Sequence, residues 1–136
     1  MAEMAEEKNS DRFAVTNITK GKLPRLPFAL LKERLLGVRY ELSLVFSGSN
    51  LSRKLNRRYR GRNQPANVLS FSLGPASGEI FIDLPRARRE ALASSTPLSL
   101  YLGGLFIHGM LHLKGRRHGS RMEREEIKFL KKFNLL

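Results

Sequence analysis

Residues 98–118 read LSLYLGGLFIHGMLHLKGRRH, a long apolar segment that is followed by a basic one and contains the three histidines of the chain. Its apolar part, Leu98–Leu113, predicts a long helix that packs inside the protein. Histidines four positions apart, His108 and His112, lie above one another on one face of such a helix, with Cβ atoms roughly 5 to 6 Å apart. Their side chains are therefore expected to reach a common point.

A third histidine follows a glycine in the same stretch. Gly115 can take the backbone conformation that ends a helix, which would return His118 toward the first two histidines. Three imidazole nitrogens with one open position are a ligand set of catalytic zinc, whereas a closed structural site needs a fourth protein ligand. Taken alone, His108 would also fit a core position, and His118 would also fit a basic loop. The spacing of the three histidines together favours metal binding. We expect His108, His112 and His118 to bind one divalent ion, with Zn²⁺ as the first candidate.

The residue after the first histidine distinguishes this pattern from that of metalloproteases. In metzincins that position is a glutamate that acts as general base, and here it is Gly109. Peptide hydrolysis would lack this base. A metzincin-like metalloprotease therefore remains the weaker alternative.

Outward from this helix, short strands alternate with amphipathic helices. Strands are expected at residues 13–16, 40–46, 67–73 and 79–82, and further helices at residues 27–36, 51–60, 84–93 and 120–133. Asp83 and Thr96 are expected to cap the helices that follow them, and Ser120 to form a capping box with Glu123. Residues 1–11 are polar and aperiodic and predict a flexible tail on a single domain of residues 1–136.

The chain is strongly basic, with 25 Lys and Arg against 12 Asp and Glu and a formal net charge of +13. Residues 51–62, LSRKLNRRYRGR, contain no acid. Such a run is often only a solvated helix face, but the charge of the whole chain favours contact with nucleic acid. The residues expected to hold an RNA backbone are Arg53, Arg57, Arg58 and Arg62.

Several function classes are excluded by composition. The chain has no cysteine, which excludes thiolate metal ligands and thiol enzymes, and its two aspartates, Asp11 and Asp83, are too few for a two-metal carboxylate shell. No apolar run is long enough to cross a bilayer. The acidic N-terminus lacks a signal sequence, so we expect a cytoplasmic protein with no membrane partner.

Three blocks together resemble the YbeY family of metal-dependent endoribonucleases and rRNA maturation factors. These blocks are NRRYRGRNQPANVLSF at 56–71, GEI at 78–80 and HGMLHLKGRRH at 108–118. The resemblance implies an α+β fold, with a small mixed sheet of about four strands flanked by helices and a zincin-like His-x3-His helix. It also implies that the three histidines bind metal, usually zinc, and that Arg60 is functionally important.

The resemblance further implies a role in maturation of the 3′ end of small-subunit rRNA and in ribosome quality control. The partners would be rRNA, the small ribosomal subunit and a ribosomal protein. The sequence departs from the family's usual pattern at four positions. Arg117 and Glu79 each stand where the family commonly has Asp, and Asn63 and Gln64 replace its Asp-Lys.

An arginine and a metal ion suit phosphodiester hydrolysis. A zinc-bound water has its pKa lowered to about 7, which makes up for the absent glutamate. Arg60 is expected at the end of its helix, where it would offer two N–H groups to the scissile phosphate. The alternative is a noncatalytic RNA-binding or ribosome-binding assembly factor in which the metal only stabilises the fold.

Overall fold

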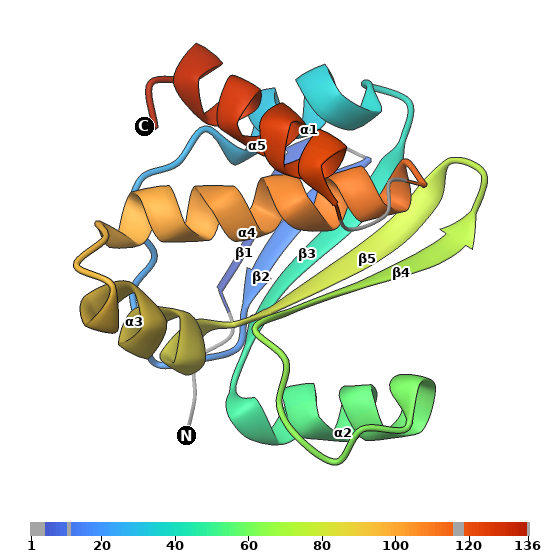
Figure 1. The fold of residues 1–136 in the computed structure, drawn as a ribbon. Coiled ribbons are helices and arrows are strands. Elements are labelled where there is room, and N and C mark those ends of the chain that lie inside the picture. Colours follow the sequence, from blue (N-terminus) through green and yellow to red (C-terminus); the bar gives the residue numbers. More distant parts are fainter. Residues whose placement is uncertain (1–4, 11, 116–118, 136) are drawn as a thin grey trace.

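The computed structural model describes residues 5–10, 12–115 and 119–135, and within them a mixed five-stranded sheet forms the centre of the molecule (Figure 1). The strands are β1 Ala5–Ser10, β2 Phe13–Asn17, β3 Glu41–Ser47, β4 Val68–Gly74 and β5 Ser77–Asp83. They lie in the order β1-β2-β3-β5-β4. The three inner strands run parallel, and each edge strand is antiparallel to its neighbour. Strand β4 is therefore one open edge of the sheet.

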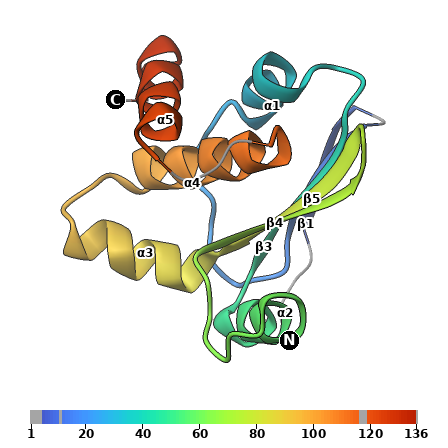
Figure 2. The same ribbon diagram turned by 45° about the vertical axis from the view of Figure 1, so that its right-hand side comes forward.

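Helices cover both faces of the sheet. They are α1 Phe28–Leu36, α2 Ser49–Arg60, α3 Leu84–Ala93, α4 Leu98–Leu113 and α5 Ser120–Lys132. Helix α4 crosses one face and contacts α1, α3 and α5, whereas α2 lies on the other face (Figures 1 and 2). None of the described helices is both long and apolar enough to cross a membrane. The sheet thus separates the helix that carries His108 and His112 from the helix that carries the arginine run.

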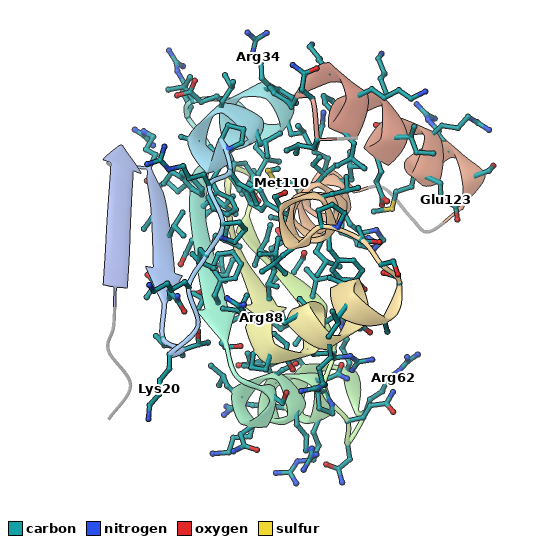
Figure 3. All side chains as sticks on the ribbon, turned by 90° about the vertical axis from the view of Figure 1, so that its left-hand side faces the viewer. Lys20, Arg34, Arg62, Arg88, Met110 and Glu123 are labelled. Carbon is teal, nitrogen blue, oxygen red and sulfur yellow. The ribbon has the colours of Figure 1, made fainter. Side chains whose placement is uncertain are left out.

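The core lies between α4 and the sheet. Alternation along residues 40–46 places four buried side chains on the α4 face, namely Tyr40, Leu42, Leu44 and Phe46. Ile80 and Ile82 of β5 pair with two of them, and Met110 of α4 packs opposite. Figure 3 shows Met110 in the interior and Arg34 and Arg62 at the periphery. Full burial of each large apolar side chain contributes about 1.5–3 kcal/mol to stability.

The predicted helix cap at Asp83 is present in the structure, and the predicted caps at Thr96 and Ser120 are not. The Asp83 carboxylate accepts a hydrogen bond from the first turn of α3, as expected. The predicted cap at Thr96 is wrong, because its hydroxyl bonds to Ser94 in the turn that ends α3. The capping box at Ser120 is also wrong, because Gly119 occupies the capping position of α5.

The polar N-terminal segment differs most from the sequence prediction. Residues 5–10 were expected to belong to a tail, but they pair with β2 as β1. Strand pairing is made by backbone groups, so a segment without apolar alternation can still extend a sheet. The small mixed sheet with flanking helices is confirmed, with this edge strand in addition. Residues 1–4 and 11 lie outside the described part of the chain.

Candidate metal centre

The C-terminal half of α4 brings two of the predicted ligands together. The Nε2 atoms of His108 and His112 lie 3.1 Å apart. Their ring centroids are 4.6 Å apart with the ring planes at 80°. Helical spacing is the cause, since side chains at i and i+4 lie on one face.

This spacing fits a metal ion. Two nitrogens at about 2.0–2.1 Å from a tetrahedral zinc are about 3.3 Å apart, close to the separation of the two Nε2 atoms. The described residues contain no group of three His, Cys, Asp or Glu side chains placed to hold a metal. His118, the third predicted ligand, and Arg117 beside it lie outside those residues. The structure therefore shows a two-histidine arrangement that a third nitrogen would complete.

Glu126 of α5 adds a carboxylate that the sequence analysis missed. Its Oε1 contacts Nδ1 of His108. An ionised carboxylate can only accept, so in a neutral ring Nδ1 carries the proton and Nε2 has its lone pair on the side facing His112. Carboxylates commonly fix the tautomer of metal-binding histidines in this way.

A signal for Glu126 is present in the sequence. Met122 is buried, and Glu126 follows it by one helical turn on the same face of α5. Helix α5 carries three glutamates, and the sequence alone does not show which of them faces α4. In the structure Glu123 is exposed. The packing of α5 against α4 makes that distinction.

Gly109 is explained by packing against the sheet. A Cβ at this position would lie 3.0 Å from Oγ of Ser70 and 3.2 Å from two atoms of Ile80. Ser70 also donates a hydrogen bond to the Gly109 carbonyl, at 3.0 Å. Position 109 thus faces the sheet, and a glutamate there would be pressed into the core rather than toward the histidines. This geometry speaks against the metalloprotease alternative.

A cleft of about 500 Å³ opens beside the histidines, between α4, α5 and the start of β4. A hydrogen-bonded group forms one side of it. Glu90 accepts from Tyr101 Oη at 2.9 Å, from Asn67 Nδ2 at 3.2 Å and from Arg86 Nε at 3.3 Å. Burial alone raises the pKa of Glu90, but these hydrogen bonds and the charge of Arg86 outweigh it and lower that pKa. Burial and the bond to Glu90 raise the pKa of Tyr101.

Arg60 is the last residue of α2 and is exposed, as expected for a helix end. Gly61 follows in the left-handed conformation, with φ of 67°. Helix α2 packs on the outer face of the sheet through Tyr59, whose ring centroid is 5.2 Å from that of Phe71 in β4. Glu79 lies opposite Phe71 in the strand pairing. Within the described residues, the structure does not bring Arg60 beside the histidines.

The other predicted RNA-binding arginines share the exposed side of α2 and the loop after it. They are Arg53, Arg57, Arg58 and Arg62, and all are exposed. The guanidinium of Arg58 lies 5.6 Å from the centre of the Tyr59 ring, and Tyr59 is 59% exposed. Ser52 and Asn56 face inward and bond to Ala66 and Gln64, which holds the loop after the helix against α2.

Comparison with protein families gives a match over almost the whole chain. The family model described as Endoribonuclease YbeY matches residues 4–135. The match includes the histidine helix, the arginine helix and the segment that leads into β4. It is consistent with the resemblance carried by the three sequence blocks.

Individual relatives agree with the family match. Endoribonuclease YbeY of Geobacillus kaustophilus is 35% identical over 111 residues, which cover 71% of this chain and 70% of that protein. Endoribonuclease YbeY of Neorickettsia sennetsu is 37% identical over 111 residues, with coverage of 74% and 78%. The solution structure of TM1509 from Thermotoga maritima has a TM-score of 0.59 at 21% identity and covers 78% of each chain. This last likeness shows a shared fold.

Proposed function

Because the chain belongs to the YbeY endoribonuclease family, we propose that it hydrolyses phosphodiester bonds in RNA with one bound divalent metal ion. The observation that carries the proposal is the pair of facing imidazole nitrogens, with a carboxylate behind His108. Facing nitrogens on one helix face suit the first two positions of a zinc site, which a third nitrogen would complete. The basic surface supplies the attraction for a polyanionic substrate.

His108, His112 and His118 would hold the metal ion, with Zn²⁺ as the first candidate. A zinc ion at such a site polarises a phosphate oxygen and lowers the pKa of water to about 7. The chain's own residues prepare the site. Glu126 retains the proton on Nδ1 of His108 and thereby keeps Nε2 available as a ligand.

The arginines of α2 would bind the RNA backbone. Arg53, Arg57, Arg58 and Arg62 contact phosphates without reading sequence, and Arg60 binds a phosphate at the helix end. Helix α2 and helix α4, which carries His108 and His112, lie on opposite faces of the sheet (Figure 2). An RNA strand held by both therefore passes around the open edge formed by β4.

The proposed substrate is ribosomal RNA. The role we propose is maturation of the 3′ end of small-subunit rRNA and ribosome quality control, with the small ribosomal subunit and a ribosomal protein as partners in the cytoplasm. Support comes from the sequence blocks that resemble the family and from the net charge of +13. Phosphate contacts alone carry no sequence information, so a partner or the shape of the RNA must select the cleavage site.

The test is cleavage of small-subunit rRNA that carries an unprocessed 3′ end. We expect cleavage by the zinc-loaded protein, loss of cleavage with a chelator and in His112→Ala, and recovery when Zn²⁺ is returned to the chelated wild type. Arg60→Glu should weaken cleavage, whereas Arg34→Glu, on the exposed side of α1, should not weaken it. Melting curves show whether each variant folds. Cleavage that persists in the chelator and in His112→Ala would reject the proposal.

A noncatalytic RNA-binding or ribosome-binding assembly factor remains a second candidate. The separation of the arginine helix from the histidines by the sheet favours it, because RNA can bind α2 without reaching the metal centre. In that case wild type, His112→Ala and Arg60→Glu are all inactive on rRNA, and wild type and His112→Ala still bind ribosomes. The same set of variants therefore separates the two functions.

A further inference from the structure

The cleft beside the histidines continues directly from the candidate metal centre. His108 and Glu126 line one end of it, and its volume is about 500 Å³. Binding sites for small ligands commonly enclose about 300–1,000 Å³. The cleft is therefore large enough for one nucleotide-sized group next to the imidazoles.

The walls of the cleft are mainly apolar. Leu100 and Leu105 of α4 face Leu130 of α5, and Val68 lies at the start of β4. Gly104 lies between these walls, one turn before His108. A Cβ built on Gly104 would meet no atom within 4 Å beyond its own helix backbone. The missing side chain thus leaves part of this space open without being needed for packing.

The polar groups of the cleft suit a neutral ligand. In the described part of the chain, no lysine or arginine lines it, while Glu126 does. Among the described residues, a phosphate inside the cleft would meet this carboxylate and no lysine or arginine. Asn67 lines the cleft and donates a hydrogen bond from its amide nitrogen to Glu90. Its amide oxygen is not used in that bond and can accept a hydrogen bond from a ligand. Nucleobases carry N–H donors at their edges and apolar faces.

We infer that this cleft receives one unstacked nucleobase of the RNA, next to the metal centre, while the phosphates farther along the strand are held by the cationic outer surface. The inference rests on the proposed function and adds to it the place where a base, rather than a phosphate, is held. Single-stranded RNA is commonly recognised through bases splayed out into such pockets. One base in the cleft would place its own phosphodiester bond near the imidazoles.

The experiment fills part of the cleft with a side chain introduced at position 104. Gly104→Leu places a side chain in the open space, and Gly104→Ala is the matched control that leaves most of it empty. The probes are a single-stranded RNA octamer and a set of octamers, each lacking one base but retaining every phosphate. Affinities of both RNAs, zinc content and melting temperature are measured for all three proteins.

We expect the wild type to bind the intact octamer roughly tenfold more tightly than one of the abasic octamers, a size typical of one bound base. Gly104→Leu should lose this preference, with unchanged zinc content and a melting temperature no lower than that of the wild type. Gly104→Ala should keep it. Equal affinities of the wild type for the intact octamer and every abasic octamer, or a preference that persists in Gly104→Leu, would overturn the inference alone. A wild type that binds none of these RNAs would overturn the proposed function and the inference together.

Discussion

A single carboxylate determines how His108 can act as a ligand. Glu126 contacts Nδ1, so the proton of the neutral ring is held on that side and the lone pair of Nε2 faces His112. The opposite tautomer would direct an N–H group toward the shared point. The ligand function of His108 therefore depends on a residue of a different helix, eighteen positions later in the chain.

Removal of this carboxylate should weaken zinc binding. We expect Glu126→Ala to lower zinc affinity by about 10- to 100-fold, the usual effect of losing such a partner. Glu126→Gln should have a smaller effect, because its amide oxygen still accepts from Nδ1. The measurement is competition for Zn²⁺ with a chromogenic chelator. Glu123→Gln, on the exposed side of the same helix, is the control, and equal affinities for Glu126→Ala and Glu123→Gln would contradict the prediction.

The lowered pKa of Glu90 predicts how the stability of the fold changes at acidic pH. Burial raises the pKa of Glu90, but hydrogen bonds from Tyr101 and Asn67 and the charge of Arg86 lower it below the ordinary value of 4.5. A carboxyl whose pKa is lower in the folded state stabilises the protein above its unfolded-state pKa. That stabilisation is lost as the pH falls from 4.5 through the folded-state value.

Melting temperatures measured between pH 6 and pH 3 should show this dependence. The wild type should lose more stability below pH 4.5 than Glu90→Gln, in which position 90 no longer titrates. Glu33→Gln, on the exposed side of α1, is the control for the removal of one carboxylate. If the curve of Glu90→Gln is parallel to that of the wild type, the lowered pKa does not contribute to stability.

Helix α4 presents different residues to the elements around it. Gly109 faces the sheet, Gly104 faces the cleft, and His108 faces α5 and His112. The two glycines therefore serve different purposes, although the sequence alone does not distinguish them. One permits close approach to Ser70 and the other leaves open space.

The same substitution at the two glycines should destabilise the fold to very different extents. Gly109→Glu forces a carboxylate against Ser70 and Ile80, and we expect a loss of about 3 kcal/mol or more in the free energy of unfolding. Gly104→Glu points into open space and should cost less than about 1 kcal/mol. Urea unfolding measures both. Gly109→Glu should also show no casein hydrolysis, and a stable variant with protease activity would restore the metalloprotease alternative.

Periodicity predicted the elements whose apolar pattern is strong. Helix α4 begins and ends where its apolar stretch does, and the alternation of Leu42 and Leu44 placed both on the buried face. Backbone pairing does not depend on such a pattern, so β1 was missed. Spacing along one helix brought His108 and His112 together, but the partnership with Glu126 depends on how α5 packs on α4, which no local pattern encodes.

At the scale of the molecule, the arginine run of α2 and the candidate metal centre lie on different faces of one sheet. Helix α2, which carries the arginine run, lies on the outer face of the sheet, and α4 lies on the opposite face (Figures 1 and 2). The cleft with the carboxylate of Glu126 opens between α4 and α5. Phosphates and bases therefore meet different surfaces. The open edge at β4 is the short route between them.

If α2 holds the phosphates, its arginines should set the salt dependence of RNA binding. For single-stranded RNA, log affinity falls with log salt by about 0.7 for each phosphate contact. The double variant Arg53→Ala with Arg57→Ala should lower the slope by about 1.4, since each substitution removes one contact. Arg34→Ala, which removes one charge from the exposed side of α1 where the double variant removes two from α2, should leave the slope unchanged. Affinities of the octamer at several salt concentrations measure these slopes, and a slope lowered by about 0.7 in Arg34→Ala would mean that RNA responds to the total charge and not to α2.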